Sequence, residues 1–201
     1  MIELKTSREL EIMKQAGRIA RLVLEELVNQ VRPGLSTLEL DQLAERLIKE
    51  GGGEPGFKKV PRYFHSICTA VNEEVVHSIP GEKKLKSGDI LSIDLGVYYR
   101  GFYSDMAVTV GVGRISDGVK KFLETGRRAL SLGIKEVRAG NHIGDISAAI
   151  EKGLRDAGCG IVESLAGHGI GRKLHEEPLV PNLGRKGSGP QLEEGMVIAI
   201  E

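Results

Sequence analysis

Cysteine is scarce in this sequence, and long apolar runs are missing from it. The two cysteines, Cys68 and Cys159, lie far apart and form no C-x-x-C pair, so neither a zinc knuckle nor a thioredoxin-like dithiol is encoded. We expect both to be free thiols in packed positions. No stretch approaches the roughly 18 apolar residues that a membrane span needs, and the N-terminal residues MIELKTSRELEIMK are too charged for a signal region. These absences predict a soluble, cytoplasmic protein.

An excess of charge of either sign is absent as well. Lysine plus arginine number 28, and so do aspartate plus glutamate, so no overall field favours nucleic acid or an anionic membrane. Several enzyme signatures are missing: HEEPL is not H-E-x-x-H, GHGIG is not G-x-G-x-x-G, and there is no Walker loop and no G-x-S-x-G elbow. The sequence therefore offers no support for a serine hydrolase or a nucleotide-binding protein.

The sequence does contain an internal repeat. With 201 residues, of which 40% are apolar, the chain can bury a core and suits one domain or two tightly joined halves. Residues 31–52 recur as residues 137–158, and SGDILSID recurs as EGMVIAIE at nearly the same spacing. Each half reads as two helices followed by strands, and the capping-box pattern Ser36-x-x-Glu39 opens one of these helices. Unless the similarity is chance, the repeat predicts an α+β fold of two related halves, about 1–112 and 113–201, with helices outside and sheets facing a shared cleft.

Two acidic residues interrupt strand-like sequence, Asp94 in SIDLGV and Asp105 in YSDMAV. A hairpin turning within YYRG would place them directly opposite each other, which is unfavourable for like charges unless a cation or a shared proton neutralises them. Their apolar neighbours alternate onto the other face of the strands. We therefore expect a metal site, and the alternative is two solvent-facing aspartates on an open sheet.

The repeat also indicates an unfinished second half. Glu201 corresponds to Asp94, but the sequence ends where the first half continues through a second acidic strand. Symmetry therefore predicts a further strand with another acidic ligand, and we expect the chain to be part of a longer protein.

A histidine in the segment AGHGIGRKLHEEP lies between Asp105 and Glu201 in the sequence. His168 is surrounded by Gly167, Gly169 and Gly171, which lets backbone and a cation approach it closely. His175 and His77 remain ambiguous from their local sequence. One imidazole with several carboxylates suits Mn, Fe, Co or Zn, and two cations could share bridging carboxylates.

Taken together, the blocks NEEVVHSIP, GDILSIDLGVYYRGFYSDMAVTV, GHGIGRKLHEEP and GMVIAIE resemble the bacterial type I methionine aminopeptidases, over the whole length of the chain. The resemblance implies the pita-bread fold of the M24 metallopeptidases and two divalent metal ions, with Co, Mn, Fe or Zn as candidates. It also implies a set of metal ligands, of which the family's fifth, a later glutamate, lies beyond the sequence. The ligands that it places within the sequence are Asp94, Asp105, His168 and Glu201.

The resemblance further implies removal of the initiator methionine by a metal-activated water. Glu201 would carry the proton, His175 would stabilise the developing charge, and His77 would contact the peptide beyond the scissile bond. The methionine pocket falls on Phe57, Tyr63, Cys68 and Leu174, although each could equally be ordinary core.

The implied partners are peptides and nascent chains with an N-terminal methionine, and the ribosome is the expected place of action. Neither a specific nucleic acid nor a membrane is implied, and a monomer is expected. Two alternatives stay open: a non-catalytic or impaired pita-bread binding protein, and a proline dipeptidase of the same fold, which usually carries an extra N-terminal domain.

Overall fold

The chain divides into two compact units in the computed structural model, which describes all residues, 1–201. The first unit is Glu11–Lys120, and the second combines Met1–Leu10 with Lys121–Glu201. Both divisions fall inside helices, namely α1 (Ser7–Gln30) and α3 (Asp117–Lys135). Each unit contains its own antiparallel sheet, so the predicted α+β class is confirmed. The division into halves of about 1–112 and 113–201 was derived from the sequence repeat, and it stays a prediction.

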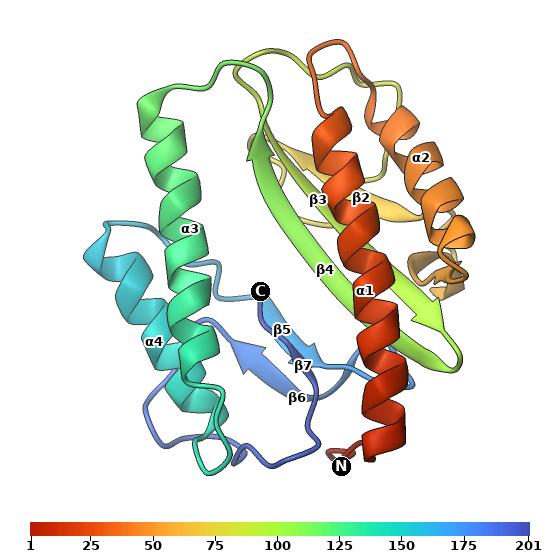
Figure 1. The fold of residues 1–201 in the computed structure, drawn as a ribbon. Helices are drawn as coiled ribbons and strands as arrows, with labels where there is room; N and C mark the ends of the chain where they lie inside the picture. The colour runs from red at the N-terminus through yellow and green to blue at the C-terminus, as the bar shows by residue number, and fades with distance from the viewer. The chain divides into compact units, whose positions relative to one another are not determined.

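The first unit packs helices against a four-stranded sheet. Strand β3 is central: β4 pairs with its whole length, and β1 and β2 share its other edge (Figure 1). The elements besides most of α1 are α2 (Thr37–Glu50), β1 (Glu54–Pro55), the 3-10 helix η1 (Phe57–Lys59), β2 (Ile67–Val71), β3 (Ile90–Tyr99) and β4 (Phe102–Gly111).

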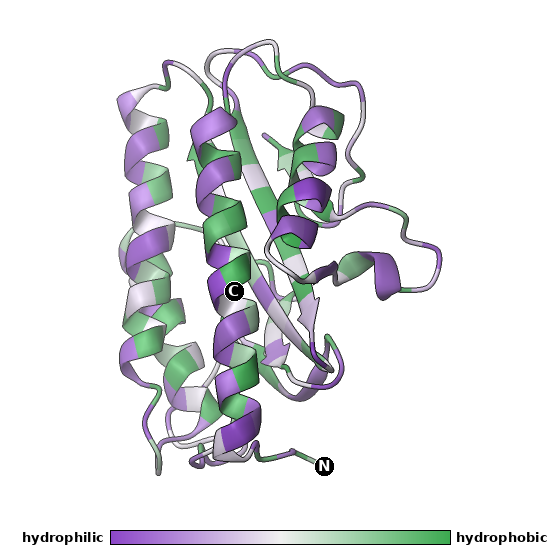
Figure 2. Cartoon of the chain, turned by 45° about the vertical axis from the view of Figure 1, so that its right-hand side comes forward, coloured by the Kyte–Doolittle hydropathy of each residue, from purple (hydrophilic) through white to green (hydrophobic).

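The core of the first unit follows from periodicity. Apolar residues recur at helical spacing in α1 and α2, and they alternate with polar ones along β3. Leu27 of α1, Leu40 of α2 and Ile93 of β3 are fully buried in one cluster, and burying each such side chain stabilises the fold by about 1.5–3 kcal/mol. Figure 2 shows the resulting hydrophobic and hydrophilic stripes on the helices.

The second unit contains a smaller sheet in the order β6-β5-β7. Its other elements, besides most of α3 and the first turn of α1, are α4 (Ile143–Asp156), β5 (Ala166–Gly169), β6 (Glu176–Pro181) and β7 (Ile198–Ala199). Ile146 and Ile150 of α4 and Val180 of β6 are buried together in its core. No helix of either unit is both long and apolar enough to span a bilayer.

The predicted repeat extends into the hydrogen bonds of the loops. In the first unit the backbone N–H of Gly34 donates to the carbonyl of Leu85 at 2.8 Å, and in the second unit Gly140 donates to Leu192 at 2.9 Å. Both glycines have positive φ, +87° and +93°, a conformation that side chains other than glycine rarely adopt. The two loops therefore share a backbone conformation and a hydrogen bond at corresponding positions of the sequence repeat.

The predicted register of the hairpin is wrong, because Asp94 does not pair with Asp105. Asp94 is opposite Ala107, and Asp105 is opposite Gly96. The turn residues are Arg100 and Gly101, with φ of 48° and 92°, as a type I′ turn requires. The prediction centred the turn one residue too early, and this error shifts every pair by two positions. The two carboxylates are diagonal neighbours on one face of the sheet.

Candidate metal centre

His168 is held on the central strand of the small sheet. It pairs with Leu179 of β6 and Ala199 of β7, and it is only 5% exposed. The glycines beside it are needed for close packing of the backbone: a Cβ at Gly167 would lie 2.3 Å from the carbonyl oxygen of Ala199. The lack of a side chain at Gly167 thus lets the backbone of Ala199 approach closely, whereas the approach of a cation to His168 stays a prediction.

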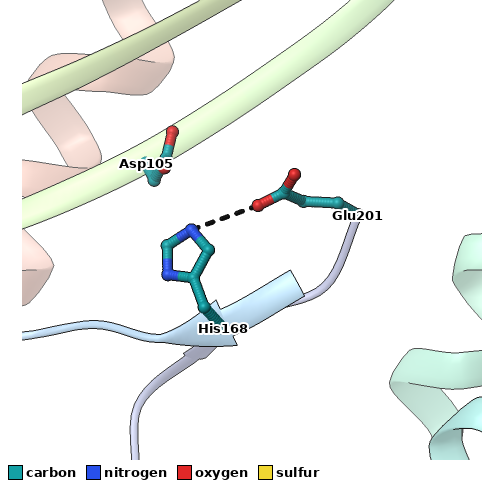
Figure 3. A group of neighbouring side chains, drawn as sticks. All are labelled: Asp105, His168 and Glu201. Atoms are coloured by element: carbon teal, nitrogen blue, oxygen red, sulfur yellow. Dashed lines mark ion pairs between the residues drawn. The ribbon is translucent and has the colours of Figure 1, made fainter. Parts of the chain in front are cut away.

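Hydrogen bonding fixes which nitrogen of His168 can bind a ligand. Nδ1 lies 2.8 Å from the carbonyl oxygen of Gly169, and because a carbonyl only accepts, Nδ1 must donate. In a neutral ring the lone pair then sits on Nε2, which is 3.2 Å from Oε1 of Glu201 in the same unit (Figure 3). A backbone acceptor at the remote nitrogen is how proteins orient a metal-binding imidazole. His168 and Glu201 therefore bring one ring nitrogen and one carboxylate oxygen close together, and both are donor types that bind divalent ions.

His175 packs against His168 from the residue directly before β6. The two rings meet edge to face, with centroids 4.4 Å apart and planes at 73°. His175 is exposed while His168 is buried, so the contact places a solvent-accessible imidazole beside the candidate ligand. In the second unit the structure thus brings together three of the predicted site residues, His168, His175 and Glu201.

In the first unit, Asp94 and Asp105 line one face of the β3–β4 hairpin. Both are partly buried, whereas Ile93 and Leu95, the neighbours of Asp94, point into the core and are fully buried. The alternation predicted around Asp94 is confirmed. Ser92, on the same face, shares a hydrogen bond of 2.8 Å with the Thr109 hydroxyl. The face therefore presents two carboxylates from a polar strip.

Three of the predicted pocket residues lie together in the first unit. The Tyr63 hydroxyl donates to the carbonyl of Ile67 at 2.7 Å and lies 3.1 Å from Sγ of Cys68, while the rings of Phe57 and Tyr63 meet edge to face. Burial raises the pKa of the Cys68 thiol to about 11 and also raises the pKa of Tyr63. Both side chains are therefore neutral at pH 7. Leu174, the fourth pocket residue, is buried in the second unit.

His77 lies in a loop after β2 of the first unit. Its φ of 58° is left-handed, which is uncommon for a residue other than glycine, and its side chain is exposed. The next residue, Ser78, accepts a backbone hydrogen bond from Thr69 of β2 at 3.0 Å. The loop is thus attached to the sheet at the residue beside His77.

Two buried polar groups close to the predicted site residues could not be identified from the sequence. Lys5 and Glu176 form a buried ion pair in the second unit, and Asp41 of α2 binds the chain just after Tyr63 in the first unit. No short motif identifies either group, because the partners are far apart in sequence. A weak signal was Gly171, whose lack of a side chain makes room for Lys5.

Comparison with known proteins identifies the family. The family model described as "Metallopeptidase family M24" matches residues 11–201, and the chain belongs to this metallopeptidase family. It is 48% identical to methionine aminopeptidase 1 of Bacillus subtilis over 201 residues, which is 100% of this chain and 81% of the relative. The resemblance inferred from the motifs is confirmed.

Solved structures show the same fold. The crystal structure of methionine aminopeptidase from Thermotoga maritima matches with a TM-score of 0.97 at 38% identity, covering 100% of this chain and 81% of that chain. A Xaa-Pro dipeptidase from Bacillus anthracis matches with a TM-score of 0.85 at 28% identity, covering 98% of this chain and 53% of that chain. The predicted pita-bread fold is confirmed, and the similarity is greater to the methionine aminopeptidase.

Proposed function

We propose that this protein is a metallo-aminopeptidase that removes the initiator methionine from peptides and nascent proteins. The observation that carries the proposal is the environment of His168, whose Nδ1 donates to a backbone carbonyl while Nε2 lies 3.2 Å from the Glu201 carboxylate. Membership of a metallopeptidase family and 48% identity to a methionine aminopeptidase support it.

The proposed metal ligands are Asp94, Asp105, His168 and Glu201. Within the second unit, His168 and Glu201 supply a ring nitrogen and a carboxylate oxygen that lie 3.2 Å apart. Within the first unit, Asp94 and Asp105 lie on one face of the β3–β4 hairpin. Three carboxylates with one imidazole fit two divalent ions, with Mn, Fe, Co and Zn as candidates, because hard oxygen donors outnumber the borderline nitrogen. When bound, such ions lower the pKa of a water molecule and polarise the scissile carbonyl.

The remaining steps fall to side chains of this protein. The Glu201 carboxylate accepts the proton of the attacking water and returns it to the leaving amine. His175 donates a hydrogen bond to the oxygen that becomes negative in the transition state, and its exposed ring beside His168 supports that role. His77 holds the peptide beyond the scissile bond.

The residues proposed for the methionine pocket are Phe57, Tyr63, Cys68 and Leu174, of which the first three lie together in the first unit. Methionine is unbranched and polarizable, and it prefers an apolar slot without charge. The neutral state of Cys68 and the internally satisfied hydroxyl of Tyr63 support such a slot. We further propose that the protein is a cytoplasmic monomer that acts on nascent chains near the ribosome.

Hydrolysis of Met-Ala-Ser tests the proposal. We expect cleavage after methionine in the presence of Mn²⁺ or Co²⁺, no cleavage after treatment with EDTA, and recovery when the ion is restored. Ala-Pro serves as the comparison, because a Xaa-Pro dipeptidase would cleave it. If the protein cleaved Ala-Pro but not Met-Ala-Ser, it would be a Xaa-Pro dipeptidase and not a methionine aminopeptidase. Metal binding without cleavage of either peptide would favour a binding protein.

A further inference from the structure

A buried ion pair joins the N-terminal segment to the loop that carries His175. Nζ of Lys5 and Oε2 of Glu176 are 2.5 Å apart, and their side chains are only 5% and 10% exposed. Both residues belong to the second unit. Burying a lysine and a glutamate removes both from water, so such a pair is a weak source of stability compared with apolar residues of similar size. Its presence calls for another explanation.

Glu176 also binds the backbone of the loop that precedes it in the sequence. Its second carboxylate oxygen, Oε1, accepts a hydrogen bond of 3.0 Å from the backbone N–H of Lys173. Burial opposes the charge of Glu176, but hydrogen bonds from Lys5 and from the backbone outweigh it and lower the pKa of this carboxyl. The carboxylate therefore links the backbone at Lys173 to the first residue of β6.

Lys5 is itself held in place. Its backbone N–H donates to the carbonyl of Gly195 at 2.8 Å, and Nζ also donates to the carbonyl of Glu3 at 2.9 Å. The approach depends on Gly171, where a Cβ would lie 2.4 Å from Cε of Lys5 and 2.8 Å from Oε1 of Glu176. The end of the Lys5 side chain thus occupies the space left by the missing side chain of Gly171.

The anchored carboxylate is adjacent to His175 in two ways. Glu176 is the next residue in the chain and begins β6, where it pairs with Gly169. Gly169 is in turn the neighbour of His168, whose ring His175 contacts. A shift of Glu176 would therefore move the backbone of His175 relative to His168.

We propose that the Lys5–Glu176 ion pair is a positioning device for His175, which it holds edge to face against His168. This inference rests on the role proposed for His175 in peptide hydrolysis. The pair is buried and includes none of the proposed metal ligands or substrate-binding residues, so its loss is expected to lower turnover while leaving substrate binding and metal affinity in place. A displacement of about 1 Å at a catalytic group can lower a rate by about a hundredfold, and we expect a loss of tenfold or more.

Two variants separate positioning from stability. Glu176→Gln keeps the shape and the acceptor for Lys173 but removes the charge. The double variant Lys5→Met with Glu176→Leu replaces the buried pair by apolar residues, which is often neutral or stabilising. The matched control is Lys152→Met, which removes the lysine of an exposed pair on α4. Each variant is measured for thermal unfolding, Mn²⁺ affinity, and kcat and KM on Met-Ala-Ser.

A readout without metal or substrate completes the test. The imidazole NMR signals of ¹³C-histidine-labelled protein are recorded in EDTA, and the His175 signal is assigned from a His175→Gln variant. We expect both pair variants to shift or broaden this signal while the signal of His65 stays in place, and we expect kcat to fall at least tenfold with KM within twofold. The double variant should unfold near the wild-type temperature and still have low kcat.

The inference would be overturned if the double variant had both the stability and the kcat of the wild-type protein. It would also be overturned if the His175 signal did not move in the pair variants. If the double variant does not fold, Glu176→Gln decides by the same measures. Failure of the wild-type protein to cleave Met-Ala-Ser would refute the proposed function alone, because the NMR comparison still tests whether the pair positions His175.

Discussion

Replacement of Asp41 by alanine should destabilise the first unit by about 2–6 kcal/mol. The Asp41 carboxylate is 7% exposed and accepts two backbone hydrogen bonds through Oδ1, from Ser66 at 2.7 Å and from Ile67 at 3.1 Å. Its other oxygen lies 3.0 Å from Nδ1 of His65. Each backbone N–H that loses its acceptor in the interior costs about 1–3 kcal/mol, and alanine removes the acceptor of both.

Asp41→Asn distinguishes the hydrogen bonds from the charge. An asparagine oxygen can still accept from both backbone donors, and a neutral His65 can accept from the amide, so the loss should stay below about 1.5 kcal/mol. Asp156→Ala, at an exposed position of α4, should change stability by less than about 0.5 kcal/mol. Urea unfolding followed by circular dichroism measures all three variants.

The same carboxylate anchors the chain just after Tyr63, so Asp41→Ala should also raise KM for methionine peptides more than it changes Mn²⁺ affinity. An alanine variant within 1 kcal/mol of the wild-type protein would refute the reasoning, because it would mean that the two backbone donors find other partners at no cost.

Three further outcomes are expected. Asp94→Asn and Asp105→Asn should each lower the Mn²⁺ affinity measured by calorimetry, because each removes an anionic ligand. The control Asp117→Asn, at a fully exposed position, should not change this affinity. If both variants bind Mn²⁺ as tightly as the wild-type protein, neither aspartate is a ligand. His175→Ala should lower kcat by about a hundredfold, equivalent to about 3 kcal/mol, with Mn²⁺ affinity retained, and an intact kcat would reduce this residue to a structural role. Cys68, with its pKa raised to about 11 by burial, should have a thiolate fraction of about one thousandth at pH 8 and should react with iodoacetamide far more slowly in native protein than in urea. Because this pKa lies above the ordinary 9.0, the stability linked to the neutral thiol is present below pH 9 and declines as pH rises through about 11; equal labelling rates in the two states would contradict the burial argument.

The helices and the repeat could be predicted because their signals are local. Ser36 accepts a hydrogen bond from the backbone of Glu39, whose carboxylate accepts one in return, as the capping-box pattern predicts. In the repeat, Asp145 accepts from the backbone of His142 in the same way at 2.7 Å. Histidine is not among the usual helix caps, so only the alignment of the two halves pointed to this helix start.

The hairpin register could not be fixed by the same means. Alternation specifies which face a strand residue occupies, and Asp94 and Asp105 were placed correctly on one face. The pairing, however, depends on the position of the turn, and a change of one residue at the turn moves every partner by two. In the observed turn Arg100 has a positive φ, which is unusual for arginine, so the residue type did not indicate the position of the turn.

Buried polar pairs between distant residues were beyond sequence reasoning. Lys5 reads as part of a charged N-terminal segment, and Glu176 as one of two successive glutamates, HEEP. Their burial arises only when the segment pairs with Gly195 and Gly171 leaves space beside it. Contacts of this kind depend on tertiary structure, and no local propensity encodes them.

The space beside Gly171 has an evolutionary consequence. A methyl group there would collide with Cε of Lys5, and the ammonium group at the end of that side chain is matched by the charge of Glu176. The three positions are therefore expected to co-vary among relatives: a protein with alanine at the place of Gly171 should have a shorter residue at the place of Lys5. Where the acid at the place of Glu176 is lost, the lysine should tend to be lost with it, since an unpaired charge in the interior is destabilising.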